Sequence, residues 1–255
     1  MRVPRARRGR RDLDARNRSA FERIRLRPRT LVDVSGRSQQ VTLFGKTYTA
    51  PFGVAPTGAA GLYWHDADVA LARAAAAAGV PFVLSTASFV EMERVAREAG
   101  GTKWFQLYAS KDRAASERLV TRARDSGYEA LVVTTDVCVG ANRQYNLRNG
   151  FEIPFRLNMA NVVQGALHPR WLVNVFLRTL ITSGMPRFRN VDTNGADMVS
   201  TGRATLYGAA AAGEAGALRA IDILKSEVDR VMALLGARTV AELTRDHLVM
   251  PENAA

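Results

Sequence analysis

The sequence has little cysteine, and its single thiol, Cys138, excludes any intramolecular disulfide. A chain of this kind fits a reducing compartment. Long apolar runs are missing as well, because no uninterrupted stretch reaches the roughly 20 residues that cross a bilayer. The arginine-rich N-terminus is not followed by the apolar segment of a secretory signal. These absences predict a cytoplasmic protein without a membrane span.

Positive charge is abundant, but most of it lies at one end. Residues 1–30 hold twelve arginines against Asp12, Asp14 and Glu22, so this segment supplies +9 of the net charge of +12. We interpret residues 1–30 as a basic N-terminal arm, which is either simply solvated or attracted to anionic lipid or nucleic acid. No aromatic residues interleave with its first ten positions, which argues against a nucleic-acid partner.

Apolar strands alternate with amphipathic helices through the next hundred residues. We expect strands at 51–55, 80–85, 103–108 and 129–136, and helices at 66–79, 89–100 and 111–127. The first helix has Asp66 as its expected N-cap and Gly79 at its end. Strand followed by helix, repeated with short links, predicts an α/β protein with a parallel sheet.

The alternation stops after the fourth strand. Residues 151–195 form an apolar and basic insert that contains the stretch WLVNVFLRTLI at 171–181, with arginines on both sides. A strand at 196–201, a glycine-bounded turn at 202–208 and a long amphipathic helix at 213–236 are expected after it.

Polar residues follow the carboxyl ends of the expected strands, where parallel α/β folds bind ligands. They are Pro56, Thr57, Gly58, Ser85, Gln106, Tyr108, Thr134, Arg143, Gly202 and Arg203. Hydroxyls, an amide, a phenol and two arginines at one rim suit an anionic ligand with a flat ring. Each also has a plain structural explanation, since Ser85 and Thr134 can cap helices, Tyr108 can pack, and Arg143 can be a surface charge.

Several blocks in the same order resemble the FMN-dependent α-hydroxy-acid dehydrogenases and oxidases. They include APFGVAPTGAAGL, GVPFVLSTAS, WFQLY, GYEALVVTTDV, RQYNLRNGF and GRATLYGAAAAGEAG. The TTDV motif and the apolar insert most resemble those of the bacterial membrane-associated mandelate and lactate dehydrogenases. The resemblance implies a TIM barrel that binds FMN, oxidises an (S)-2-hydroxy acid to the 2-oxo acid, and passes electrons to a quinone-type acceptor. It also implies peripheral contact with the inner face of the membrane.

The resemblance further implies roles for the residues at the rim. Pro56, Thr57 and Gly58 would lie along the flavin ring, and Ser85, Gln106 and Thr134 would bond its polar edge. Gly202 and Arg203 would meet the FMN phosphate. For the substrate, Tyr108 would contact the hydroxyl or carbonyl oxygen, and Arg143 would pair with the carboxylate, as a planar guanidinium can.

Other parts of the family pattern are missing between residues 1 and 255. The SNHGGRQ motif, which carries the catalytic histidine base and a second carboxylate-binding arginine, is absent, as are the flavin-tuning lysine and the DGGxR phosphate turn. The histidines, His65, His168 and His247, do not match the motif, so no catalytic residue is assigned. Of these, His65 is the first candidate for a substitute base.

The missing motifs predict an internal deletion of three βα units, joined near Gly195. Strands 1–4 and 8 would remain in the order 8-1-2-3-4, so residues 31–255 would form an incomplete TIM-barrel-derived domain. Two strand edges and an apolar face would then be exposed, which favours self-association into a homo-oligomer.

The function expected from the sequence is therefore an FMN-dependent hydroxy-acid dehydrogenase with impaired turnover. Two alternatives stay open. One is a non-catalytic remnant that binds flavin, and the other is a basic binder of membrane surfaces or nucleic acid that acts through residues 1–30.

Overall fold

The computed structural model describes residues 24–110, 112–135, 165–190 and 203–249, together with Ser19 and Glu22. The chain divides into two compact units. The smaller unit combines Met1–Thr47 with Ser226–Ala255, and the larger unit is Tyr48–Lys225. The larger unit contains the parallel sheet and the residues that the sequence predicts to form a site.

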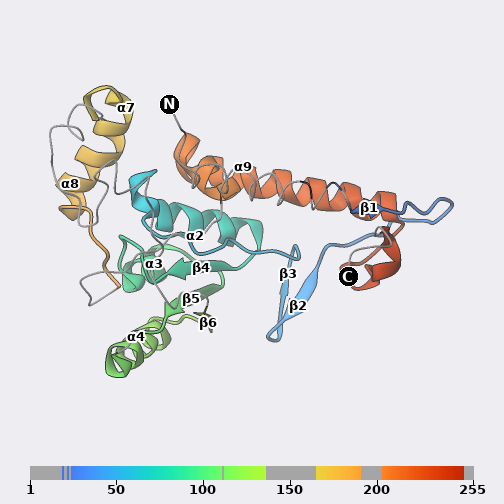
Figure 1. Ribbon diagram of the computed structural model, residues 1–255, viewed down its shortest axis with the longest axis horizontal. Coiled ribbons are helices and arrows are strands. Elements are labelled where there is room, and N and C mark those ends of the chain that lie inside the picture. Colours follow the sequence, from blue (N-terminus) through green and yellow to red (C-terminus); the bar gives the residue numbers. More distant parts are fainter. Residues whose placement is uncertain are drawn as a thin grey trace, which may run out of the picture. The chain divides into compact units, whose positions relative to one another are not determined.

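Three parallel strands form the centre of the larger unit (Figure 1). They are β4 (Phe82–Ser85), β5 (Lys103–Tyr108) and β6 (Ala130–Thr134), in the order β4-β5-β6. The first expected strand is reduced to one parallel bridge, Val54 with Phe82, on the other side of β4. The order of the first four barrel strands is therefore confirmed. The expected last strand, 196–201, lies outside the described residues.

The helices α2 (Ala67–Ala78), α3 (Met92–Glu98) and α4 (Arg113–Asp125) follow the strands as predicted (Figure 1). Alternation along each strand separates two faces, since successive side chains point to opposite sides of a sheet. The core contains Phe82, Leu84 and Phe105 from one face, packed with helix residues such as Leu71, Met92 and Leu119. The other face carries Ser85 and Gln106.

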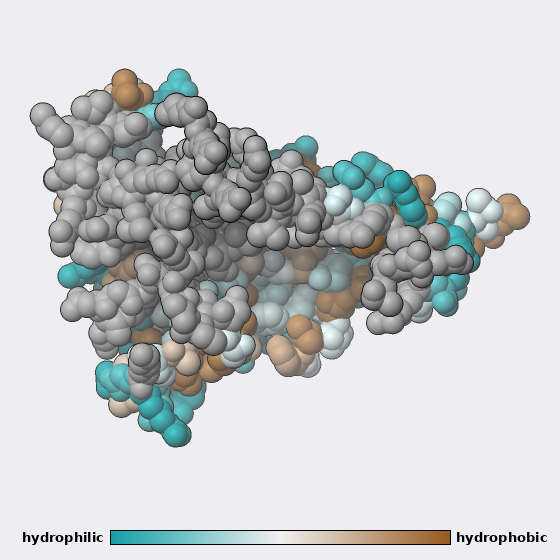
Figure 2. Space-filling view, viewed as in Figure 1, coloured by the Kyte–Doolittle hydropathy of each residue, from teal (hydrophilic) through white to brown (hydrophobic). Residues whose placement is uncertain are grey.

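One residue fixes the start of α4, and another fixes the end of α2. Asp112 caps α4, because its carboxylate accepts a hydrogen bond from the backbone N–H of Ala115 at 3.2 Å. The exposed side of α4 is largely hydrophilic, as Figure 2 shows. Gly79 ends α2 with a left-handed φ of 67°, as expected, and an added Cβ would lie 2.6 Å from the Thr49 methyl.

Asp66 occupies the N-cap position of α2, as expected, but its side chain does not cap the helix. Asp66 adopts a left-handed φ of 52° and makes no side-chain cap bond. Its carboxylate instead accepts two hydrogen bonds from Arg94 of α3, at 3.0 and 2.5 Å. A bidentate ion pair of this kind binds a carboxylate more strongly than one backbone N–H does.

Within its described part, residues 165–190, the insert is helical from Pro169 to Ser183. It consists of α7 (Pro169–Trp171), the π-helix η2 (Leu172–Leu177) and α8 (Arg178–Ser183), which follow one another without interruption. Val175, Phe176 and Thr179 are buried, whereas Val173 and Ile181 are 56% and 83% exposed. The insert therefore packs through one face and presents a second, apolar face to solvent.

The expected glycine-bounded turn at 202–208 is also wrong. Helix α9 (Arg203–Leu235) already begins at Arg203, ten residues before the predicted helix. The alanine-rich sequence between Arg203 and Ala212 has high helix propensity, and one internal glycine costs only about 1 kcal/mol. The break falls later, at Ala212 and Gly213, whose backbone angles are not helical.

The smaller unit contains two short antiparallel pairs. Strand β1 (Arg25–Leu26) pairs with β7 (Leu248–Val249), and β2 (Val41–Leu43) pairs with β3 (Lys46–Tyr48). A bidentate ion pair joins Arg37 to Asp229, with distances of 2.9 and 2.8 Å. This pair fastens the N-terminal segment to the C-terminal part of α9. The 3₁₀ turns η3 (Val240–Glu242) and η4 (Arg245–His247) follow the helix.

Candidate functional site

Three polar side chains stand in a row at the carboxyl ends of β4, β5 and β6. The register aligns Ser85 with Gln106 and Tyr108 with Thr134. The hydroxyl of Ser85 lies 3.3 Å from Gln106 Oε1, and Gln106 Nε2 donates to Thr134 Oγ1 at 3.0 Å. The sequence predicted that these residues share a rim, and the structure brings them into direct contact.

Gln106 is the centre of this row. Its side chain is fully buried, and the backbone N–H of Thr86 also donates to its Oε1 at 3.3 Å. Because a backbone N–H can only donate, this contact fixes which end of the amide is the oxygen. The amide nitrogen then faces Thr134. It keeps a second N–H, and Thr134 keeps its own hydroxyl proton, so both can donate to a further acceptor.

Of the other predicted site residues that the structure describes up to Thr134, three lie on the loop after Val54 and one is the last residue of β5. Thr57 and Gly58 are buried and Pro56 is half-buried, on the loop that leaves the bridge at Val54. Tyr108 is half-buried at the end of β5, and its backbone N–H donates to the hydroxyl of Thr86 at 3.3 Å. Arg143 and Gly202 lie outside the described residues. Arg203 is the first residue of α9, and its side chain is outside the described part.

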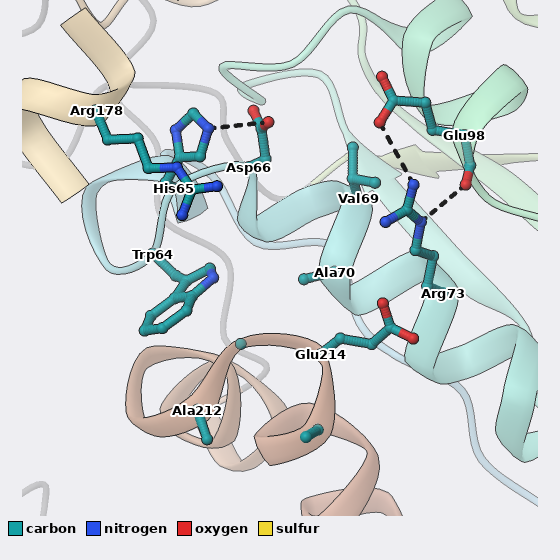
Figure 3. Close-up of a pocket in the computed structure, with 12 residues that line it drawn as sticks. Trp64, His65, Asp66, Val69, Ala70, Arg73, Glu98, Arg178, Ala212 and Glu214 are labelled. Atoms are coloured by element: carbon teal, nitrogen blue, oxygen red, sulfur yellow. Dashed lines mark hydrogen bonds and ion pairs between the residues drawn. The ribbon is translucent and has the colours of Figure 1, made fainter. Parts of the chain in front are cut away.

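A second polar cluster surrounds a cavity of about 370 Å³ between α2, the insert and the break in α9 (Figure 3). His65, Asp66 and Arg178 lie on one side of it, and Arg73 with Glu98 on another. Gly213 permits the close approach of Trp64, since an added Cβ would be 3.0 Å from the indole. The break in α9 therefore coincides with a packing contact.

His65 does not have the surroundings of a substitute base. Its ring is 8% exposed, with Nδ1 3.0 Å from Thr179 Oγ1 and Nε2 3.2 Å from Asp66 Oδ2. Burial lowers its pKa, and Arg178 and Arg94 lower it further, so the neutral ring is favoured. The neutral ring satisfies both contacts when Nε2 carries the proton. His65 thus links the loop before α2 to the insert.

Aromatic residues of the insert make the same connection. Trp171 Nε1 donates to the carbonyl of Leu62 at 2.7 Å, and its ring stacks on Phe176 with centroids 5.9 Å apart. Phe176 is 8% exposed, so it packs within the fold. These two side chains hold the insert against the loop that follows residues 56–58.

The end of the insert is fastened by hydrogen bonds to the loop after β4. Buried Asn190 accepts from the backbone N–H of Met92 at 3.1 Å and donates to the carbonyl of Val90 at 3.0 Å. The backbone N–H of Arg189 donates to the carbonyl of Ser88 at 3.0 Å. Asn190 thereby satisfies a donor at the start of α3, a position where helices leave N–H groups without intrahelical partners.

Asp68 is a buried carboxyl group that the sequence analysis missed. It lies in α2 with 1% exposure, and Ser88 Oγ is 2.7 Å from its Oδ2. Burial raises the pKa of Asp68 to about 7, against the effect of the Ser88 hydrogen bond. Ser88 Oγ also lies 3.0 Å from the carbonyl of Val90. One hydroxyl proton cannot bond fully to both acceptors, so below its pKa a protonated Asp68 would donate to Ser88 and leave the Ser88 proton for Val90.

Most of this chain matches one known protein family. The family described as FMN-dependent dehydrogenase matches residues 7–193 and 191–250. The chain belongs to this family. The match consists of two segments that meet at residues 191–193, close to the junction expected near Gly195.

Individual relatives agree with an internal deletion. The chain is 44% identical to an (S)-mandelate dehydrogenase of Pseudomonas putida over 174 residues, which cover 68% of this chain and 43% of that protein. It therefore spans less than half the length of this curated relative. It is 29% identical to a peroxisomal (S)-2-hydroxy-acid oxidase of Oryza sativa subsp. japonica over 317 residues, covering 91% of this chain and 86% of that protein. An alignment of 317 positions on 255 residues leaves at least 62 positions without a counterpart here.

Solved structures support the same fold. The chain superposes on the crystal structure of a monotopic membrane protein, (S)-mandelate dehydrogenase, with a TM-score of 0.75 and 28% identity. The superposition covers 91% of this chain and 90% of that one. With the partial parallel sheet, this identifies the fold as an incomplete TIM barrel. Within the described ranges, no helix is both long and apolar enough to cross a membrane.

The residues of the row fit the ring of FMN, the cofactor in the family's description. A flavin ring is flat, and one edge carries carbonyl oxygens and ring nitrogens. The amide of Gln106 and the hydroxyls of Ser85 and Thr134 offer donors and acceptors to such an edge from three adjacent strands. The described residues do not form a comparable binding site for the phosphate group of FMN.

Replacing Asp68 with asparagine should remove part of the pH dependence of folding. The pKa of Asp68 is raised in the folded chain from 3.8 to about 7, so the folded state binds its proton more tightly than the unfolded state does. The contribution of Asp68 to the free energy of unfolding is complete below about pH 4. It is lost as the pH rises through about 7, and the loss amounts to up to about 4 kcal/mol. The wild-type chain should lose stability across this window in urea unfolding, and Asp68→Asn should lose much less, because its amide still donates to Ser88.

Asp222→Asn is the matched control, because Asp222 is an exposed carboxylate in α9. It should follow the wild-type pH profile. An Asp68→Asn profile parallel to wild type would show that Asp68 is ionised in the fold.

Proposed function

We propose that this chain binds FMN and takes (S)-2-hydroxy acids of the mandelate or lactate type as substrates, with slow turnover to the 2-oxo acid. The observation that carries the proposal is the hydrogen-bonded row of Ser85, Gln106 and Thr134 at the carboxyl ends of three parallel strands. A quinone-type acceptor would take up the electrons. Bound FMN would supply the two-electron oxidation, and the chain's own residues would bind and orient.

The roles within this site follow the order of the strands. Gln106 and Thr134 would donate to the flavin edge, and Pro56, Thr57 and Gly58 would line its face. Tyr108 would contact the oxygen at the reacting carbon of the substrate, and Arg143 would bind the carboxylate. Gly202 and Arg203 would provide what remains of the phosphate contacts.

Slow turnover is proposed because nothing in the sequence matches the SNHGGRQ motif. Loss of a positioned general base costs about 10² to 10⁴ in rate. His65 does not replace it, since both ring nitrogens are engaged and the ring is buried. The second candidate, a flavin-binding remnant without any turnover, rests on this same absence.

The first experiment measures flavin binding by quenching of FMN fluorescence. Gln106→Leu removes the amide that joins β4 to β6, and the loss of one or two hydrogen bonds is worth about 1 to 3 kcal/mol. We expect the dissociation constant to rise by about tenfold or more. Gln40→Leu is the matched control, because Gln40 is exposed in the smaller unit. Equal affinity in wild type and Gln106→Leu would contradict the proposed site.

Riboflavin serves as a second ligand in the same titration. The DGGxR turn is absent from the sequence, so the phosphate should add little to the affinity. Riboflavin and FMN should therefore bind with similar, weak affinity, and a strong preference for FMN would mean that another phosphate site exists.

We also propose peripheral attachment to an anionic membrane through the insert. Val173, Leu177, Leu180 and Ile181 recur at helical spacing and are partly to largely exposed. Arginines flank this apolar face, and residues 156–189 contain no Asp or Glu. A face of this kind needs to enter only the headgroup region, and each arginine near an anionic surface adds about 1 kcal/mol.

Co-sedimentation with lipid vesicles tests this attachment. Val173→Asn with Ile181→Asn makes the exposed face polar and leaves the buried residues Val175 and Phe176 in place. We expect wild type to sediment with anionic vesicles more than with neutral ones, less so at high salt, and the double variant to lose about tenfold in binding.

The matched control is Ile223→Asn with Leu234→Asn, since both residues are exposed on α9 at 44% and 60%. It should bind vesicles as wild type does. Unchanged binding by the insert variant would assign attachment to the basic arm, residues 1–30.

A further inference from the structure

Strand β6 is an edge of the parallel sheet (Figure 1). Within the described ranges it pairs only with β5, from Trp104 with Ala130 to Tyr108 with Thr134. Its sequence, ALVVT, contains no charge, proline or glycine. Natural edge strands usually carry lysine, proline or a bulge, which prevent pairing with another chain. β6 has none of these protections.

Two side chains of β6 are exposed on the face of the sheet that helices cover. Leu131 and Val133 are 41% and 51% exposed, although their partners on β5, Phe105 and Leu107, are buried at 0% and 6%. All four point to the helix-covered face of the sheet. Among the described residues, that face is covered as far as β5 and open at β6. In one relative, the hydroxy-acid oxidase of Oryza sativa subsp. japonica, the alignment continues through at least 62 positions that this chain lacks.

We propose that β6 pairs with β6 of a second copy of this chain, in antiparallel orientation and centred on Val132. A two-fold axis at Val132 places Leu131 opposite Val133 of the partner, and Ala130 opposite Thr134. Both exposed apolar residues then face apolar residues. The same surface is used by both copies, which gives a closed dimer and no continuing fibre.

The charges around β6 agree with this register. The nearest described charge is Glu129, which would stand opposite Thr135 of the partner, since both are three residues from the centre. The two Glu129 carboxylates therefore lie at opposite ends of the paired segment. Like charges directly opposite each other would destabilise a strand pair, and this register avoids them.

Antiparallel pairing leaves the candidate flavin sites apart. The carboxyl ends of the strands point in opposite directions in the two copies, so each row of Ser85, Gln106 and Thr134 stays at its own end of the joined sheet. Dimer formation and flavin binding can therefore be measured independently. Failure of one would not imply failure of the other.

The mass of the full chain, measured by light scattering over a concentration series, tests the proposal. Wild type should be a dimer at the upper end of the series. Val133→Lys should be monomeric at every concentration, because it places a charge in the pairing edge. Val173→Lys, at a comparably exposed valine of the insert, should remain a dimer.

Cysteine crosslinking tests the register. In a Cys138→Ser background, Val132→Cys should form a disulfide-linked dimer on mild oxidation, because only the central residue faces its own copy. Thr121→Cys, which is exposed on α4, should not. A monomeric wild type would overturn the proposal, and so would a dimer that survives Val133→Lys or that Val132→Cys does not crosslink.

Discussion

The parallel register of β4, β5 and β6 is the constraint on which the candidate site depends. Backbone pairing sets Ser85 beside Gln106 and Tyr108 beside Thr134, so residues more than twenty positions apart meet at one edge. A shift of one residue would turn Gln106 into the helix-packed face and bring Phe105 to the rim. The core residues Leu84 and Phe105 oppose such a shift, because both are fully buried on the other face.

The loops after the first two strands are held by buried polar contacts. Asp68 and Asn190 meet the same short segment, Ser88–Met92, from α2 and from the end of the insert. His65 and Trp171 join the insert to the loop between Val54 and α2. Unpaired buried polar groups are costly, so these contacts specify one position for the insert. The insert, which is proposed to face the membrane, is thereby connected to the loop beside the proposed cofactor site.

Local patterns in the sequence predicted the elements well. Lys103–Tyr108 is a strand at the expected bounds, and Gly79 ends α2 as expected, because apolar runs and terminal glycines act through nearby residues. The rim residues Ser85, Gln106 and Thr134 followed from a general rule about parallel sheets. The roles of these residues and of Tyr108 stay predictions.

Contacts between distant residues account for the predictions that were wrong. Asp66 was expected to cap its own helix, but Arg94, twenty-eight residues away, takes its carboxylate. The break in α9 falls at Gly213, which lies against Trp64, and no local signal separates this glycine from Gly208. Asp68 could have been suspected, since it is the one acidic residue on the buried alanine stripe of α2. Arg143 and Gly202 lie outside the described residues.

Turnover by the flavin-loaded chain is the most direct measurement of the proposed function. Purified protein is incubated with FMN, an artificial electron acceptor, and (S)-mandelate or L-lactate. If the chain retains the flavin-ring side of the site without a positioned base, the rate should be slow, about 10² to 10⁴ below that of a relative that carries the SNHGGRQ motif. Robust turnover that requires both the protein and FMN would contradict this and would mean that another residue acts as the base.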